Sequence, residues 1–119
     1  MFDREIKLIG IDNYNKIKSK TVAVIGVGGV GGYATEALVR AGIENIIIVD
    51  YDKVDITNLN RQIIHLEKDI GRYKVDSAEE KVKEINQYAK VKKYKKYLDK
   101  SNADVLLQDA DIILDCVDN

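Results

Sequence analysis

Short runs of aliphatic residues alternate along the chain with stretches in which apolar residues recur at helical spacing. Residues 21–25, 46–49 and 111–117 are nearly continuous β-branched or aliphatic runs, which are typical of strands buried on both faces of a sheet. Between the first two runs, an apolar helical stripe is predicted at Val30, Ala34, Ala37, Leu38 and Ala41, with Gly42 as its stop. A second helix is predicted from Lys74, with apolar positions at Val75, Ala78, Val82 and Ile85. This alternation predicts an α/β fold, a Rossmann-like and mostly parallel sheet with flanking helices.

The other segments are less regular. Residues 1–20 predict one or two short amphipathic helices, and residues 52–73 form a long polar segment of the kind that is usually functional. The Lys-rich residues 91–98 predict an edge strand, in preference to a nucleic-acid patch. Ser101 is predicted to be the N-cap of a short helix that runs through Leu107.

Residues 1–119 are predicted to form one nucleotide-binding domain, with a helical segment at 1–20 and a Rossmann-like core at 21–119. Only Asp118 and Asn119 follow the last predicted strand, whereas a doubly wound sheet needs a further helix to cover one face. We therefore expect a sheet truncated after its fourth strand, in the N-terminal part of a longer protein. A partner subunit that covers this face is the alternative.

Charge and composition exclude several classes of protein. The 19 basic and 20 acidic residues are interspersed and give a net charge of -1, so no overall field favours nucleic acid or membrane. Cys116 and His65 are the single residues of their kinds, which excludes an internal disulfide and argues against a zinc site. The chain has neither a signal-peptide pattern nor an apolar run of roughly 20 residues, and this predicts the cytoplasm.

Five of the eight glycines lie within residues 26–32, directly after the first predicted strand and before the first helix. Gly26, Gly28 and Gly31 give the spacing G-x-G-x-x-G, in which backbone N–H groups reach a phosphate at the positive end of a helix. A packing turn without ligand is the alternative. Asp50 follows the second strand, where a carboxylate accepts hydrogen bonds from ribose hydroxyls. These features fit NAD as well as ATP.

Polar and charged residues beyond the second strand favour ATP. Residues 52–62 are rich in polar side chains, whereas a dehydrogenase needs an apolar nicotinamide pocket. Arg61 and Lys74 could together hold a triphosphate, and Asp118, after the last strand, could hold Mg²⁺ against it. Each of these residues, taken alone, could instead be a solvated surface group.

In order along the chain, the motifs resemble those of the ThiF/MoeB/HesA family, the ubiquitin-activating-enzyme-like adenylating proteins. They are Gly26-Val27-Gly28-Gly29-Val30-Gly31, Asp50-Tyr51-Asp52, Asn58-Leu59-Asn60-Arg61-Gln62, Asp69-Ile70-Gly71-Arg72-Tyr73-Lys74-Val75 and Asp115-Cys116-Val117-Asp118-Asn119. The resemblance spans nearly the whole chain. It is the ordered set, rather than any one motif, that is specific.

The resemblance implies a role for each matching residue. Asp50 would bind the ribose, the glycine loop and Lys74 would lie against the α-phosphate, Arg61 would neutralise phosphate charge, and Asp118 would carry Mg²⁺. Arg4 would reach into the site of a neighbouring subunit, so that a homodimer is required. The nucleotide contacts implied in this way are Gly26, Gly28, Gly29, Gly31, Asp50, Asp52, Asn58 and Gln62.

The activity implied is ATP-dependent adenylation of the C-terminal carboxylate of a ubiquitin-like sulfur-carrier protein of thiamine or molybdopterin type. A transfer-RNA threonylcarbamoyladenosine dehydratase of the same fold family is the alternative, and nucleic acid would be a partner only in that case. An NAD-dependent oxidoreductase domain and a nucleotide-binding module without turnover are two further hypotheses.

Overall fold

The computed structural model describes residues 18–54 and 70–117. The predicted helical segment at the N-terminus lies almost entirely outside these residues, as does most of the polar segment after the second strand. Predictions for residues 1–17, 55–69 and 118–119 therefore stay predictions.

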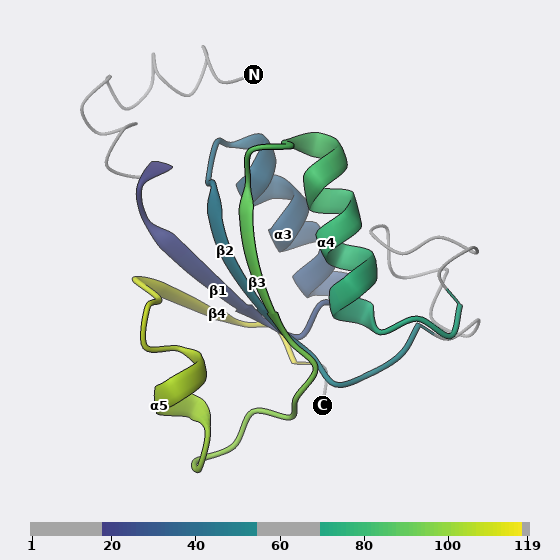
Figure 1. Cartoon of the computed structure of the whole chain (residues 1–119), viewed down its shortest axis with the longest axis vertical. Coiled ribbons are helices and arrows are strands. Elements are labelled where there is room, and N and C mark those ends of the chain that lie inside the picture. Colours follow the sequence, from purple (N-terminus) through teal and green to yellow (C-terminus); the bar gives the residue numbers. More distant parts are fainter. Residues whose placement is uncertain (1–17, 55–69, 118–119) are drawn as a thin grey trace.

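Four parallel strands form one sheet in the order β3-β2-β1-β4, and they are β1 (Thr21–Ile25), β2 (Asn45–Val49), β3 (Lys90–Tyr94) and β4 (Ile112–Asp115). The helices α3 (Gly29–Arg40) and α4 (Lys74–Ile85) cover one face, and the short α5 (Ala103–Leu106) lies on the other (Figure 1). This arrangement confirms the predicted Rossmann-like fold.

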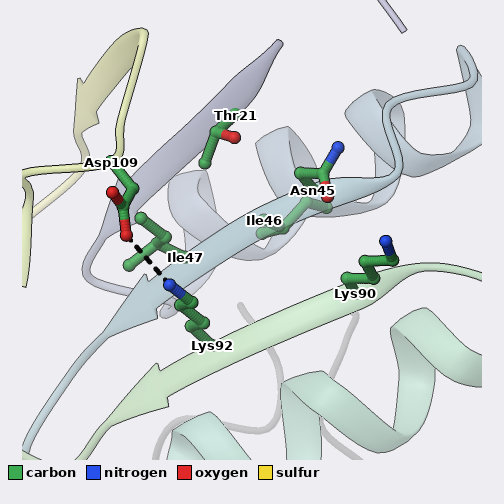
Figure 2. Close-up of a pocket in the computed structure, with 7 residues that line it drawn as sticks. All are labelled: Thr21, Asn45, Ile46, Ile47, Lys90, Lys92 and Asp109. Carbon is green, nitrogen blue, oxygen red and sulfur yellow. Dashed lines mark hydrogen bonds and ion pairs between the residues drawn. The ribbon is translucent and has the colours of Figure 1, made fainter. Parts of the chain in front are cut away.

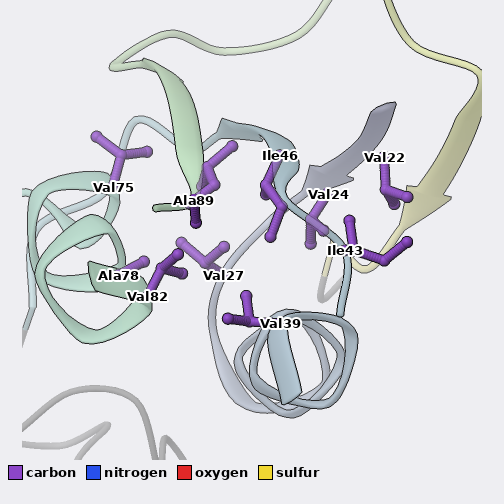
Figure 3. Close-up of a cluster of buried hydrophobic side chains, with 11 residues drawn as sticks. Val22, Val24, Val27, Val39, Ile43, Ile46, Val75, Ala78, Val82 and Ala89 are labelled. Atoms are coloured by element: carbon purple, nitrogen blue, oxygen red, sulfur yellow. The ribbon is translucent and has the colours of Figure 1, made fainter. Parts of the chain in front are cut away.

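The core follows the pleat of β1 and β2. Val22, Val24, Ile46 and Ile48 point toward α3 and α4, and the side chains of that larger cluster fill the space between sheet and helices (Figure 3). The intervening residues, such as Ile47, pack with Leu106 of α5 on the other face. Both faces of the two central strands are thus buried, as their continuous aliphatic runs predict.

The predicted apolar stripe of α3 is confirmed at Leu38, which packs against the larger core cluster, but it is wrong at other positions. Ala37 is exposed and Ala34 only half-buried, whereas Gly31, Thr35 and Val39 are buried against the sheet. Thr35 can be buried because its hydroxyl donates to the Gly31 carbonyl at 2.7 Å. The helix packs closely through its small residues, so the apolar periodicity alone misjudged the buried face by part of a turn.

The predicted stop of α3 is confirmed. Gly42 has a φ of 107°, and its N–H donates to the Val39 carbonyl while the N–H of Ile43 donates to the Leu38 carbonyl. These two bonds form a Schellman motif, which requires the left-handed backbone that glycine adopts without a side-chain clash.

Two predictions near the C-terminal end are corrected. The strand β4 forms, but it is an edge strand whose Ile112 and Ile113 are 47% and 50% exposed, so it is not the buried strand that its aliphatic run predicts. The helix α5 begins after Asn102 rather than after Ser101 and ends at Leu106. Asp99 accounts for this shift, since its carboxylate accepts the backbone N–H groups of Ser101 and Asn102 and holds them in a turn.

The strand β3 lies at the edge of the sheet, as predicted, but it covers Lys90–Tyr94 rather than residues 91–98. Lys93 in this strand and Lys95 just after it attach it to α4. Lys93 Nζ lies 2.7 Å from Asp76 Oδ1 and 2.8 Å from Glu79 Oε1, and Lys95 Nζ lies 3.0 Å from Asp76 Oδ2. Lys93, and after it Lys95, hold the pKa of Asp76 below its ordinary value of 3.8, against the opposing effect of desolvation. Asp76 is therefore ionised at neutral pH.

Replacing Asp76 with asparagine is expected to lower the free energy of unfolding by about 1 kcal/mol at neutral pH, because two lysines lose their shared carboxylate. A depressed native pKa stabilises the fold above the unfolded value and loses this effect as pH falls through the native value. The difference between wild type and variant should therefore begin to shrink as the pH falls below about 3.8, and it should disappear only below the lower native pKa.

Urea unfolding at several pH values measures this effect. Asp109→Asn is the matched control, because Asp109 and Lys92 form an ion pair with both side chains more than half exposed. The control should change stability little at any pH. An Asp76→Asn variant that is as stable as wild type at neutral pH would show that the cluster contributes nothing.

Candidate functional site

The predicted site residues that the structure describes lie where the parallel strands end, at the carboxyl edge of the sheet. Three backbone hydrogen bonds continue the ladder past the ends of the strands, from Gly26 N–H to the Val49 carbonyl, from Asp50 N–H to the Tyr94 carbonyl and from Cys116 N–H to the Ile25 carbonyl, at 2.8, 3.1 and 2.8 Å. The glycine loop, Asp50 and the segment after β4 are thereby held side by side. In open α/β sheets this edge is where ligands bind.

Gly26 and Gly31 shape the turn from β1 into α3. Gly26 has a φ of 85°, which disfavours any residue with a side chain. A Cβ on Gly31 would lie 1.7 Å from the Gly26 carbonyl oxygen, so glycine is needed for the helix to approach the strand so closely. Gly28 is the N-cap of α3 and no side chain caps this helix, which leaves N–H groups of its first turn free to bind an anion.

Asp50 connects this turn to the end of β2. Its Oδ2 accepts the N–H of Val27 at 2.9 Å, and its Oδ1 accepts the N–H of Asp52 at 2.9 Å. A carboxylate has about four acceptor positions, so each oxygen can still take a further hydrogen bond from a ligand hydroxyl. The carboxylate therefore orients the glycine loop and remains available to a ribose.

Lys74 is brought to the same edge by pairing between two segments of the polar stretch. Val54 N–H donates to the Arg72 carbonyl, Lys74 N–H donates to the Asp52 carbonyl, and Lys53 and Tyr73 form an antiparallel bridge. The Lys74 side chain is 9% exposed and its Nζ lies 3.9 Å from Asp52 Oδ2. At this distance the ion pair is loose, which suits an ammonium group that also meets a phosphate.

Cys116 follows β4, rather than lying within it as predicted from sequence, and its side chain packs partly against the larger core cluster. Burial, and secondarily the charge of Asp115, raises the pKa of its thiol. A thiol with a raised pKa is a poor nucleophile at neutral pH. Cys116 is therefore a packing residue beside Gly26 and Gly31.

Five predicted site residues lie outside the described residues, and they are Arg4, Asn58, Arg61, Gln62 and Asp118. Their roles remain predictions. Within residues 18–54 and 70–117, no group of three or more His, Cys, Asp or Glu side chains could hold a metal ion. No helix in these ranges is long and apolar enough to cross a membrane.

The ThiF family model matches residues 2–119. The chain belongs to the ThiF family. Among curated relatives, it is 39% identical to the adenylyltransferase and sulfurtransferase MOCS3 of Culex quinquefasciatus, over 99% of this chain and 27% of the relative. It is 42% identical to the adenylyltransferase and sulfurtransferase UBA4 of Vanderwaltozyma polyspora, over 92% of this chain and 25% of the relative. The chain thus spans about a quarter of the length of these relatives.

Solved structures of similar proteins include two that hold ATP. Escherichia coli tRNA N6-threonylcarbamoyladenosine dehydratase, TcdA, in complex with ATP superposes with a TM-score of 0.92 at 30% identity, over 99% of this chain and 49% of that one. E. coli MccB with ATP gives a TM-score of 0.71 at 28% identity, over 77% of this chain and 27% of that one. The resemblance to the ThiF family inferred from the ordered motifs is therefore confirmed.

A pocket of this ThiF-family chain lies at the opposite edge of the sheet and takes no part in the site. It is lined at the amino ends of the strands by Thr21, Asn45, Ile46, Ile47, Lys90, Lys92 and Asp109 (Figure 2). Lys92 and Asp109 face each other across it at 2.9 Å and neutralise each other. Lys90 is then the one charged side chain of the lining outside this ion pair.

Tyr51 and Tyr97 were missed by the sequence interpretation. Their rings meet at a centroid distance of 5.2 Å beside Asp50. The position of Tyr51, directly after the ribose-binding candidate, is a signal that the sequence offers. The contact with Tyr97 is tertiary and no local pattern predicts it.

Proposed function

We propose that this ThiF-family chain supplies the nucleotide site of an ATP-dependent adenylyltransferase that activates the C-terminal carboxylate of a ubiquitin-like sulfur-carrier protein. The observation that carries the proposal is the convergence, at one edge of the sheet, of the glycine loop at the start of α3, the Asp50 carboxylate and the Lys74 ammonium group. Similarity to the MOCS3 and UBA4 adenylyltransferases supports this assignment.

Each of these groups suits one part of ATP. Asp50 accepts hydrogen bonds from the ribose hydroxyls, and the free N–H groups at the start of α3 bind phosphate oxygens at the positive end of the helix dipole. Lys74 is nearly buried, so its charge acts on a phosphate through a medium of low dielectric constant. Gly26, Gly28, Gly29 and Gly31 let the backbone approach, and Asn58, Arg61 and Gln62 would add polar contacts.

The reaction needs positioning and charge neutralisation rather than a general base. An oxygen of the carrier carboxylate attacks the α-phosphorus, the bond from that phosphorus to the bridging oxygen of pyrophosphate breaks, and an acyl-adenylate and pyrophosphate form. The carboxylate is already ionised and nucleophilic, while negative charge grows on the phosphoryl oxygens. Lys74, Arg61 and the N–H groups of α3 would stabilise that charge.

Magnesium fits the donor set at this edge. Asp52 has a half-exposed carboxylate beside Lys74, and Asp118, which follows the last strand in the sequence, would supply a second carboxylate. Mg²⁺ keeps several waters and is usually held by one or two carboxylates and the substrate phosphates. We assign Asp118 as its main ligand. When bound, the ion neutralises charge on the phosphates.

We further propose a homodimer, in which Arg4 of one subunit enters the site of its neighbour, and a cytoplasmic location. The homodimer rests on the family resemblance of the N-terminal arginine. Neither proposal changes the chemistry at Asp50 and Lys74.

Exchange of labelled pyrophosphate into ATP tests the proposed reaction. The full-length protein should catalyse exchange only when a carrier with a free C-terminal carboxylate is present. The same carrier with its C-terminus amidated is the matched control, because it removes the nucleophile and leaves the folded carrier intact. Exchange that is absent with every sulfur carrier tested would contradict the assignment.

The TcdA structures support a second candidate, dehydration of threonylcarbamoyladenosine in transfer RNA, although their 30% identity is below the 39% of MOCS3. That candidate predicts retention of modified transfer RNA and no response to any carrier. Both activities use ATP at the same edge of the sheet, so the two assays together distinguish them.

A further inference from the structure

Tyr73 lies where three segments of the chain meet. It is the N-cap residue of α4, and its ring packs, partly buried, against the larger core cluster. The Nζ of Lys53, in the segment after β2, lies 5.2 Å from the centroid of this ring, and the Nζ of Lys95, just after β3, lies 4.8 Å from it. The face of an aromatic ring attracts ammonium groups at such distances. The ring therefore ties the start of α4 to the segments that follow β2 and β3.

Backbone and side-chain contacts hold the residues around Tyr73 as well. Lys53 and Tyr73 form an antiparallel bridge, and the Tyr73 carbonyl accepts the N–H of Asp76 at 3.1 Å in the first turn of α4. Lys95 Nζ, which lies over the ring, also lies 3.0 Å from Asp76 Oδ2. Lys95 thus contacts both Tyr73 and Asp76, so the start of the helix is held at two points.

Lys74 lies between these contacts, and its position depends on them. Its N–H donates to the Asp52 carbonyl at 2.9 Å, so its backbone moves with the paired segments that Tyr73 holds. Its side chain is 9% exposed, so close packing restricts its stem and the place of its Nζ follows from the place of its backbone. The ion pair with Asp52 is loose, at 3.9 Å, and does not fix the ammonium group. A shift of the first turn of α4 would therefore move the Lys74 charge away from a phosphate.

We propose that Tyr73 is a positioning residue for Lys74. Its ring, contacted by the Lys53 and Lys95 ammonium groups, holds the first turn of α4 where the Lys74 ammonium group meets the phosphates of the nucleotide. The inference rests on the proposed function, since it takes the role of Lys74 from that site. Tyr73 acts only through Lys74 and touches neither the nucleotide nor the carrier carboxylate. The role requires an aromatic ring and does not require the phenol hydroxyl.

Affinity for Mg²⁺-ATP, measured by calorimetry with and without the Lys74 amine, separates positioning from a merely structural role. Lys74→Met keeps a long side chain and is expected to weaken binding about 10- to 100-fold. Tyr73→Leu keeps apolar bulk in the core but no ring, and it should weaken binding about 5- to 10-fold. Added to Lys74→Met, Tyr73→Leu should weaken binding less than about twofold further, because the effects of two residues that act through one group are not additive. Tyr73→Phe keeps the ring and should bind ATP as wild type does.

Tyr88→Leu is the matched control, because Tyr88 is 74% exposed and precedes β3 at the opposite edge of the sheet. It should bind ATP as wild type does. Lys95→Met removes one of the two ammonium groups and leaves the ring in the core. It replaces Tyr73→Leu if that variant does not fold, and the same pattern of ATP affinities is expected of it.

Wild-type ATP affinity in Tyr73→Leu, or the same loss with and without the Lys74 amine, overturns the inference and leaves the proposed function standing. A Tyr73→Phe variant that binds as weakly as Tyr73→Leu overturns it too. A Lys74→Met variant that binds ATP as wild type does contradicts both the inference and the role of Lys74 in the proposed site. A wild-type chain that binds no ATP contradicts the proposed function itself.

Discussion

Replacing Gly31 with alanine is expected to destabilise the fold by at least about 4 kcal/mol, a large part of the total stability of a small domain. The added Cβ would lie 1.7 Å from the Gly26 carbonyl oxygen and 2.8 Å from its carbonyl carbon. Both atoms belong to backbone that is tied to β2 by the bond from Gly26 N–H to the Val49 carbonyl. Because no flexible side chain can yield, α3 must move away from the sheet. Urea unfolding measures the loss.

Gly71→Ala is the control for this prediction. Gly71 has a φ of 88°, but a Cβ there would have no atom within 4 Å. The cost should therefore be only the strain of a left-handed backbone, about 1–2 kcal/mol. Equal destabilisation by the two alanines would mean that close approach of α3 is not what requires Gly31.

Replacing Asp50 with alanine is expected to weaken ATP binding by about 1–3 kcal/mol, because ribose hydroxyls and loop N–H groups lose their acceptor. The variant should also unfold about 1 kcal/mol more easily, since Val27 and Asp52 no longer share the carboxylate. Asp50→Asn keeps one acceptor oxygen, so its ATP affinity and its stability should lie between those of wild type and Asp50→Ala. Calorimetric titration measures the change in ATP-binding free energy, and urea unfolding measures the change in the free energy of unfolding.

Asp111→Ala is the control that separates loss of ATP affinity from loss of stability. The Asp111 carboxylate likewise accepts a backbone N–H, that of Thr21 at 2.8 Å, but at the amino edge of the sheet. This variant should lose a similar amount of stability and none of its affinity for ATP. If Asp50→Ala binds ATP as tightly as Asp111→Ala does, Asp50 is not the ribose acceptor.

Much of the fold is local in origin and could be predicted. The runs that form β1 and β2 are aliphatic at every position because both faces of these strands are covered. The left-handed Gly42 ends α3 where the sequence indicates. The buried face of α3 and the exposure of β4 depend instead on which elements pack nearby. Ala37 and Ile113 carry no local sign of their exposure.

Some features of the candidate site could likewise be predicted from the sequence, and others could not. Gly26 and Asp50 follow buried strands, and parallel strands bring their carboxyl ends to one edge, so their proximity could be predicted from topology. The tie from Val27 to the Asp50 carboxylate and the ring contact of Tyr51 with Tyr97 join residues far apart in the chain. Such contacts depend on backbone positions that only the folded structure specifies.

Calorimetric titration with Mg²⁺-ATP beside an identical titration with NADH shows which nucleotide the site binds. The glycine loop and Asp50 suit either ligand, whereas Lys74 and the family relationship favour ATP. We expect saturable binding of ATP, weakened by Asp50→Ala, and no binding of NADH. Binding of NADH with no binding of ATP would contradict this expectation.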